Sequence, residues 1–476
     1  MNNPTNCGAA MRFLLLSVAC LALTAFASAS PARAGRNDGD QGKKEFWLAR
    51  FSADVTIPLG HRCMGIQPIK AQKIVDPLQV HGFVLLGSGD PIVLAAVDWC
   101  EIRNGAYDQW RDALAKAAGT SRERVLVTSL HQHDAPVVDA GAAALLAGVG
   151  MADEMYDVAF HKAVLERVAA ALKAGLPAAR RVTHLGLGQA KVIGVASSRR
   201  IEHPDGRVDF SRYSRSGGNA FLRDAPEGLI DPWLKTVSFW DGDQPLLALH
   251  AYAVHPMSYY GKGGVSYDFV GMARERRARD DARIAQIYVT GCSGDLTAGK
   301  YNDGSPANRP VLADKIYQAM KAAWKATKRQ PLEKIDFRNT QFSLDFHEGE
   351  DFREAALQRT LANRDAKERD RILAAMGLSS LRRISSGRKI DMPCVDLGPA
   401  QIVLLPGEAF VGYQLMAQRM RADSFVVAIG YGECWPGYIP TKAAFEDKFG
   451  HGWRWVAPGA EARLKAALRH VLAAPK

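Results

Sequence analysis

Cysteine is scarce in this sequence of 476 residues, and its seven cysteines are widely scattered. No CxxC pair occurs, so no paired-cysteine motif marks the chain. Two of the seven, Cys7 and Cys20, fall within the first 34 residues, which leaves five if that segment is removed. An odd number leaves at least one thiol unpaired, and the sequence does not say which of the others form a disulfide.

Long apolar runs are missing beyond the N-terminus, which excludes a transmembrane segment in the rest of the chain. At the N-terminus, Arg12 precedes an apolar run from Phe13 to Ala27, and small residues follow it. This run is shorter than the ~20 residues that a membrane span needs, and the pattern is typical of a cleaved secretory signal. We therefore predict a signal peptide over 1–34, a linker over 35–45 and export to a bacterial periplasm or the medium.

Neither the acidic nor the basic residues are concentrated in one segment, although the net charge of the chain is +11. No nucleic-acid-binding motif accompanies the basic residues, so we expect no nucleic-acid partner. Two interpretations of the excess stay open. The basic side chains lie on solvated helix faces, or they give the protein a peripheral contact with an anionic membrane surface.

Short apolar runs that end at Gly, Pro or Asp recur from residue 46 onward and predict strands. Helical apolar spacing lies between several of them, at 104–118, 152–174, 308–327, 409–421 and 459–473. The alternation is irregular and includes hairpin-like neighbours. It predicts an α/β (α+β) fold over 46–476, with mixed sheets and helices packed outside. Residues 346–390 are highly charged and helical in pattern, which indicates either an insertion that acts as a lid or a solvated helical hairpin.

The stretch VTSLHQHDAP places His131 and His133 at the end of an apolar strand. Alternate residues of a strand face the same side, so the two imidazoles are expected to project together at its C-terminal end. Ligands bind at that end in open α/β sheets, and paired neutral imidazoles suit zinc. The alternative is a pair of surface histidines with no ligand.

Three later stretches carry further candidates. His255 ends the strand in LLALHAYAVHP, Glu408 follows a strand in IVLLPGEAF, and Tyr438 lies in the loop YGECWPGYIPT. A carboxylate at a strand-to-helix junction suits a metal ligand or a general base, but it also suits the start of a helix. Tyr438 alone is equally well explained as a loop aromatic.

The loop GCSGDLTAGKYNDG contains Asp295 and Thr297 and is dense in Gly, Ser and Thr. Such a loop presents backbone N–H groups and hydroxyls to an oxyanion, although a plain tight turn has the same composition. The pattern GxxxxGK[ST] is absent, which excludes a P-loop, and the absence of GxSxG argues against a serine hydrolase.

Taken in order, the motifs TSLHQH, AVHPMS, GCSGDLTAGKYNDG, LPGEAF and GYIPT resemble the neutral ceramidase family, over residues 46–450. Members are zinc-dependent amidases that split the N-acyl bond of ceramide. The resemblance implies a ceramidase-like catalytic domain with the zinc ligands His131, His255, Glu408 and Tyr438. It also implies catalytic roles for His133 near the scissile amide, Asp295 and Thr297 in the loop, and Arg199 in substrate binding.

Three departures from the family pattern bear on the substrate. Thr297 stands where the family has a catalytic serine, and Asp134 stands in HQHDAP where a small hydroxyl residue is usual. The chain also ends soon after the predicted catalytic domain, so we expect no C-terminal immunoglobulin-like domain. These changes affect the expectation of ceramide as substrate more than that of the metal site.

The resulting hypothesis is a secreted hydrolase in which a zinc-activated water attacks the carbonyl of a small-molecule or lipid N-acyl substrate. His133 would move a proton to the leaving amine, and the loop around Thr297 would stabilise the oxyanion. Two alternatives stay open. One is a metal-dependent hydrolase of another ester, lactone, amide or phosphoester, and the other is a secreted metal-binding protein without turnover.

Overall fold

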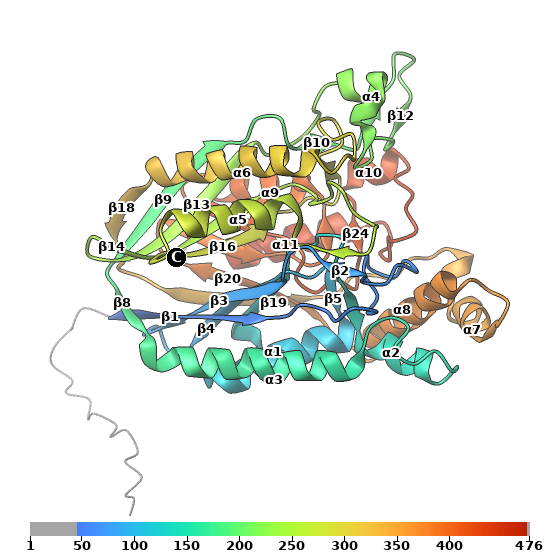
Figure 1. Ribbon diagram of the computed structural model, residues 1–476, viewed down its shortest axis with the longest axis horizontal. Coiled ribbons are helices and arrows are strands. Elements are labelled where there is room, and N and C mark those ends of the chain that lie inside the picture. The colour runs from blue at the N-terminus through green and yellow to red at the C-terminus, as the bar shows by residue number, and fades with distance from the viewer. Residues whose placement is uncertain (1–44, 474–476) are drawn as a thin grey trace, which may run out of the picture. The chain divides into compact units, whose positions relative to one another are not determined.

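The computed structural model describes residues 45–473, so the predicted signal peptide and all but the last residue of the predicted linker lie outside it. Three mixed sheets form the framework (Figure 1). Each contains one parallel pair of strands among antiparallel neighbours. The prediction of an α/β fold with mixed sheets is therefore confirmed.

The strands of the three sheets come from successive thirds of the chain. The first sheet has the order β6-β4-β3-β1-β8, from Val125–Ser129, Ile92–Val97, Gln79–Leu86, Phe46–Asp54 and Arg180–Val182. The second has the order β16-β14-β13-β9-β18, from Ala285–Thr290, Gln244–Tyr252, Trp233–Asp241, His184–Lys191 and Lys328–Pro331. The third has the order β19-β20-β21-β23, from Asp336–Phe342, Ile390–Asp396, Ala400–Leu404 and Phe425–Ile429.

The parallel pairs are β4 with β6, β14 with β16, and β21 with β23. Strands β4, β6 and β21 are buried at every position, whereas β1 alternates between buried and exposed residues over most of its length. Strands that are covered on both faces need apolar side chains on both, which explains their unbroken Val, Leu, Ile and Ala composition. The parallel pairs therefore lie in the interior, where the sheets meet.

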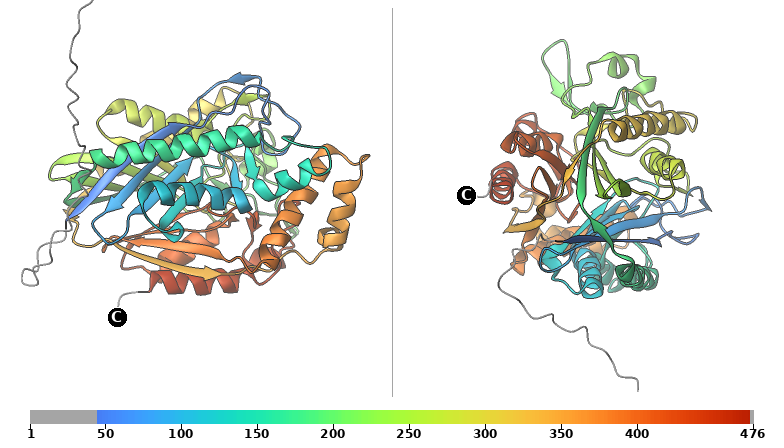
Figure 2. Two further views of the ribbon diagram at one scale, coloured as in Figure 1. Left: turned by 90° about the horizontal axis from the view of Figure 1, so that it is seen from below. Right: turned by 90° about the vertical axis from the view of Figure 1, so that its left-hand side faces the viewer.

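Helices cover the outer faces of the sheets, as the two views of Figure 2 show. The first sheet is covered by α1 (Asn104–Ala118) and α3 (Val158–Gly175), and the second by α5 (Asp268–Asp280) and α6 (Asn308–Lys325). The third is covered by α9 (Val411–Met420) and α11 (Ala460–Leu472). The remaining helices are α2 (Ala140–Ala147), α4 (Ala220–Asp224), α7 (Glu354–Ala362), α8 (Glu368–Ser385) and α10 (Lys442–Glu446).

Aliphatic side chains from all three sheets form one shared core. Leu94 and Leu126 of the first sheet, Leu249 and Ile287 of the second, and Ile402 of the third belong to the same buried cluster. Burying each such side chain contributes roughly 1.5–3 kcal/mol, so the sheets stabilise one another through this contact.

The charged segment 346–390 lies between the paired strands β19 and β20, as an insertion would. It contains α7 and α8, which pack on each other and extend from one end of the sheets (Figure 1). Residues 374–380 of α8 are buried, and α8 packs against α2. This segment is therefore not merely a solvated hairpin, because α8 contributes to the core.

The five cysteines within residues 45–473 are all buried and form no disulfide with one another: Cys63, Cys100, Cys292, Cys394 and Cys434. No helix in the described part of the chain is long and apolar enough to cross a membrane.

We expect the buried ion pair between Arg274 and Asp98 to be essential for stability. Arg274 of α5 donates to both oxygens of Asp98, at 2.6 and 2.9 Å, and both side chains are almost fully buried. Arg274→Met leaves a buried carboxylate without its partner, which costs about 3–5 kcal/mol in the free energy of unfolding.

Chemical denaturation measures this difference. The matched control is Arg283→Met, because Arg283 pairs with Asp281 at the surface in a similar two-oxygen contact. The control should unfold at the wild-type denaturant concentration. Equal destabilisation by the two substitutions would contradict the importance of burial.

Candidate active site

The C-terminal ends of the parallel strands meet at one place, and hydrogen bonds join them. The hydroxyl of Thr290, the last residue of β16, donates to Leu130 O at 2.8 Å, and Gly430 N donates to Thr290 O at 2.9 Å. Ser129 N at the end of β6 donates to Tyr431 O at 3.1 Å. The loops that follow β6, β14, β21 and β23 therefore start from neighbouring points and converge beyond the sheets.

Three of the predicted ligands come together in these loops. His131 Nε2 lies 3.0 Å from His255 Nε2 and 3.2 Å from Glu408 Oε2, and His255 Nε2 lies 3.8 Å from the same oxygen. Zinc bonds of ~2.0–2.1 Å in a tetrahedron place neighbouring ligand atoms about 3.3 Å apart, so these spacings suit one ion. Glu408 Oε2 is buried and has no hydrogen-bond partner. A buried, unpaired carboxylate oxygen is costly unless a cation occupies the space beside it.

The two histidines differ in their electrostatic surroundings. Burial lowers the pKa of His131, but the Glu408 carboxylate and Cys100 outweigh it and raise the pKa well above the usual value. Burial and the charges of Arg199 and His131 hold the pKa of His255 well below its usual value. His255 is therefore held as a neutral imidazole, the form that binds metals, whereas the Glu408 carboxylate favours the charged form of His131.

The backbone at His131 explains how its ring reaches this position. Strand β6 ends at Ser129, and His131 has φ of +68°, in the left-handed region. The expectation that His131 and His133 share one face of a strand was therefore wrong, because both lie beyond the strand. Their rings nevertheless lie together, with centroids 5.4 Å apart, and both contact His255, since His133 Nε2 is 3.3 Å from His255 Nε2. A non-glycine residue in this conformation is strained, as is common at functional sites.

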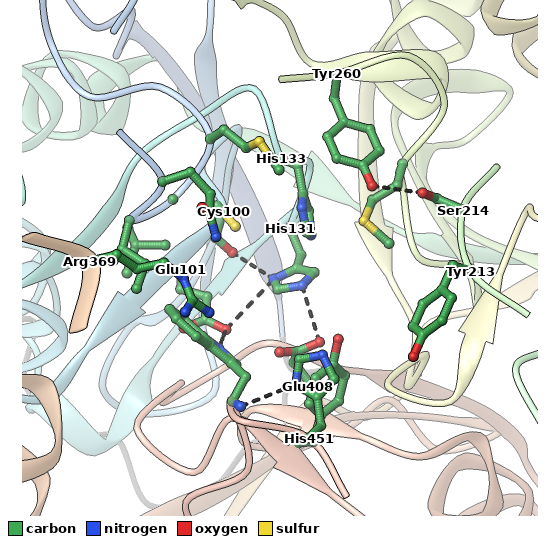
Figure 3. Close-up of a pocket in the computed structure, with 18 of the residues that line it drawn as sticks. Cys100, Glu101, His131, His133, Tyr213, Ser214, Tyr260, Arg369, Glu408 and His451 are labelled. Atoms are coloured by element: carbon green, nitrogen blue, oxygen red, sulfur yellow. Dashed lines mark hydrogen bonds and ion pairs between the residues drawn. The ribbon is translucent and has the colours of Figure 1, made fainter. Parts of the chain in front are cut away.

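Surrounding groups fix the ring of His131. Its Nδ1 lies 2.9 Å from Cys100 O, so this nitrogen donates and leaves Nε2 free to bind a metal. Tyr431 stacks on the ring with centroids 4.2 Å apart. The Glu101 carboxylate lies 4.0 Å from Nδ1 (Figure 3). Arg103 holds this carboxylate at 2.9 Å. Neither Tyr431, just after β23, nor Glu101, at the start of the short strand β5 (Glu101–Arg103), belongs to a motif that marks a functional residue in the sequence.

Tyr438 and Arg199 form a linked pair beside the ligands. The short strand β24 (Tyr438–Ile439) runs parallel to β22 (Glu408–Ala409), with Tyr438 beside Glu408. Arg199 Nη1 donates to the Tyr438 hydroxyl at 2.9 Å, while the buried Nη2 of Arg199 has no partner. Burial raises the pKa of Tyr438 despite Arg199, so the phenol is protonated here. Tyr438 and Arg199 both line the same cavity as Glu408 and His131.

Asp295 and Thr297 lie near these residues but do not line the cavity. Thr297 is in β17 (Leu296–Thr297), paired with β10 (Ser197–Ser198), and its hydroxyl accepts from Gly299 N at 3.1 Å. Asp295 accepts from Val411 N at the start of α9. Gly294 permits close packing here, since a Cβ atom would lie 2.1 Å from Glu408 O. The backbone of this loop thus supports Glu408 and Arg199. The Thr297 hydroxyl accepts a hydrogen bond within the same loop, from Gly299.

A second group of possible metal-binding side chains is formed by Cys100, His131 and His133. His131, His255 and Glu408 form the better candidate metal site, because all three are buried and one of them is a carboxylate without a hydrogen-bond partner, whereas His133 is only partly buried.

A cavity of about 230 Å³ opens onto these ligands (Figure 3). Apolar side chains, among them Met64, Ile66, Val137 and Met257, make up much of its lining. Tyr260 and Ser214 face each other across one side, and the Tyr260 hydroxyl lies 2.7 Å from Ser214 Oγ. His451, Trp453, Tyr213 and Arg369 also line it, and the sequence motifs did not indicate them.

Asp134, the unusual residue of the HQHDAP motif, has a structural role. Its Oδ1 accepts from Gly261 N at 2.8 Å, and its Oδ2 lies 3.7 Å from Arg309. Gly261 follows Tyr260, whose ring lies 5.3 Å from that of His133. Asp134 therefore holds the segment that places Tyr260 over the cavity.

Comparison with known proteins shows the fold. No protein-family model matches the chain, and no curated protein matches it by sequence. The solved structure of a neutral ceramidase from Pseudomonas aeruginosa matches with a TM-score of 0.62 and 15% identity, over 90% of this chain and 74% of that one. A ceramidase complexed with C2 matches with a TM-score of 0.63 and 15% identity, over 90% and 75% of the two chains. The fold implied by the five motifs is thus confirmed.

We expect the purified protein to contain about one divalent ion per chain, held by the ligands described above. The variants His255→Ala and Glu408→Ala each lack one ligand and should lose most of the metal. Elemental mass spectrometry of the purified proteins measures this loss. Chelation should lower the thermal unfolding midpoint of the wild type, because a ligand that binds the folded state stabilises it. His470→Ala, at an exposed position of α11, is the control and should keep its metal. Metal-free wild-type protein would contradict the site.

Asp134→Ala should lower the free energy of unfolding by about 1 kcal/mol, because the partly buried N–H of Gly261 loses its acceptor. Asp134→Asn should cost less, since its amide oxygen still accepts that bond. Chemical denaturation compares the two variants. If Asp134→Asn lowers the free energy of unfolding as much as Asp134→Ala does, loss of the hydrogen bond from Gly261 does not cause the destabilisation.

Proposed function

We propose that this chain is a zinc-dependent amidohydrolase that cleaves the N-acyl amide bond of a small-molecule or lipid substrate, as ceramidases do. One observation carries the proposal: His131, His255 and the unpaired oxygen of Glu408 converge at the bottom of a partly apolar cavity. The shared fold with two ceramidase structures supports it.

The donor set fits zinc in particular. Two imidazole nitrogens and one carboxylate oxygen are typical protein ligands of a catalytic zinc site, which keeps one further position open. Tyr438 would be the fourth ligand, since it lies beside Glu408 in the β22–β24 pair. When bound, zinc supplies a Lewis acid that polarises the acyl carbonyl and lowers the pKa of water.

The residues around the ligands would bind the substrate and move protons. Arg199 Nη2 would donate to the acyl oxygen, because it is buried, unpaired and part of the cavity wall. Burial lowers the pKa of His133 well below its usual value, so this ring is neutral and able to accept a proton before passing it to the leaving amine. The role of Thr297 would be to hold the loop that supports Arg199, whose Nε donates to Leu296 O.

Export of the protein is part of the proposal. The apolar N-terminal segment and the small residues after it support a cleaved signal and a periplasmic or secreted enzyme. A peripheral contact with a membrane surface would bring such an enzyme to lipid substrates.

Activity on a panel of N-acyl amides, esters and lactones tests the proposed function. We expect the zinc-loaded protein to release a free fatty acid and an amine from at least one N-acyl amide, as identified by mass spectrometry. Glu408→Ala should abolish this release. Zinc-loaded protein that hydrolyses no amide would contradict the proposal, and preferential cleavage of an ester or a lactone would assign a different reaction.

Arg199→Lys tests the proposed oxyanion donor. Lysine keeps the positive charge but lacks the fixed pair of N–H donors, so kcat should fall roughly 100-fold. The matched control is Arg200→Lys, because Arg200 is adjacent and exposed and pairs with Asp447 at the surface. An unchanged kcat in Arg199→Lys would remove Arg199 from the mechanism.

A further inference from the structure

The rim of the cavity carries a positive charge that the proposed function does not use. Arg369 is the second residue of α8 and lines the cavity. Figure 3 shows it reaching into the cavity from the side opposite Tyr213 and Tyr260. The charged insertion thus contributes a side chain to the site.

A buried arginine fixes the start of α8 against the cavity wall. The Arg62 guanidinium donates to Ile66 O at 3.3 Å and Gln67 O at 2.8 Å, and it pairs with the carboxylates of Glu154 and Glu368. Ile66 and Gln67 line the cavity, and Glu368 directly precedes Arg369. Arg369 therefore projects from a backbone position that the fold holds in place.

Neither carboxylate of the cavity neutralises Arg369. Among the described residues its one ion-pair partner is Asp370, at 3.6 Å, and both side chains are nearly half exposed. Glu101 is bound by Arg103 at 2.9 Å and by the indole N–H of Trp453 at 2.8 Å. Glu408 belongs to the metal ligands. With Arg199 and a divalent ion also present, the cavity has an excess of positive charge that favours an anionic ligand.

We propose that the substrate carries a carboxylate, a few bonds from the scissile amide, that pairs with Arg369. This inference rests on the proposed function and names the substrate class as N-acyl amino acids. The cavity of about 230 Å³ is smaller than the ~300–1,000 Å³ of typical ligand pockets, so it encloses only the groups around the reacting bond. A guanidinium binds a carboxylate through two parallel N–H donors, and the single positive charge of Arg369 matches the single negative charge of a carboxylate. A neutral N-acyl amine offers Arg369 no such partner.

Two substrates that differ only in charge test the inference, namely N-dodecanoylglycine and N-dodecanoylglycinamide. Wild-type kcat/KM should be about threefold to tenfold higher for the carboxylate, because the pair is partly exposed, and the preference should shrink with added salt. Arg369→Ala should remove the preference, and Arg369→Glu should reverse it. Arg364→Ala is the matched control, since Arg364 is exposed in the same hairpin and does not line the cavity. It should keep the wild-type preference.

Calorimetric binding of the same two compounds separates this inference from the proposed function. Tighter binding of the carboxylate that depends on Arg369, without hydrolysis of either compound, supports carboxylate recognition by Arg369 and counts against amide hydrolysis at this site. Equal affinities and equal rates for the two compounds in the wild type overturn the inference, whether or not they are hydrolysed. A carboxylate preference that persists in Arg369→Glu also overturns it.

Discussion

The hydrogen bonds that join the ends of the parallel strands determine the rest of the site. Thr290 contacts Leu130 and Gly430, and Ser129 contacts Tyr431, so the three sheets are bonded to one another where their inner strands end. The ligand-bearing loops start at these points. Because the shared aliphatic core lies directly behind them, the position of each loop is set by the packing of whole sheets. Each sheet leads into one candidate ligand, with His131 after β6 of the first, His255 after β14 of the second and Glu408 after β21 of the third.

The sequence predicted the fold class and several helices well, because these follow from apolar periodicity. Helices α1, α6 and α11 lie within two residues of the ranges that their spacing indicated. Helix α5 was missed, since its sequence DFVGMARERRARD is rich in arginine and lacks a clear apolar stripe. Its buried Arg274 is stabilised by Asp98, a partner about 180 residues away that local patterns do not reveal.

The candidate ligands could be named from the sequence because each follows an apolar strand in a short motif, and the five motifs occur in the order that resembles neutral ceramidases. Their relative placement was not predictable from local rules. The pairing of His131 and His133 depends on a left-handed residue after the strand rather than on strand alternation. The orientations of Thr297 and Asp295 depend on short strand pairs of only two residues each and on the start of α9, which a single sequence does not indicate. The role of Asp134 could not be predicted, because the sequence does not show that Gly261 lies beside it.

The wide separation of the ligands along the chain has a consequence for biogenesis. His131 and His255 are 124 residues apart, and Glu408 and Tyr438 follow later in the chain, in the short paired strands β22 and β24. No fragment that stops before these strands holds a complete set, and such long-range contacts form slowly. At the proposed metal site, uptake of the ion would therefore be a late event in maturation, completed only when the final third of the polypeptide has docked.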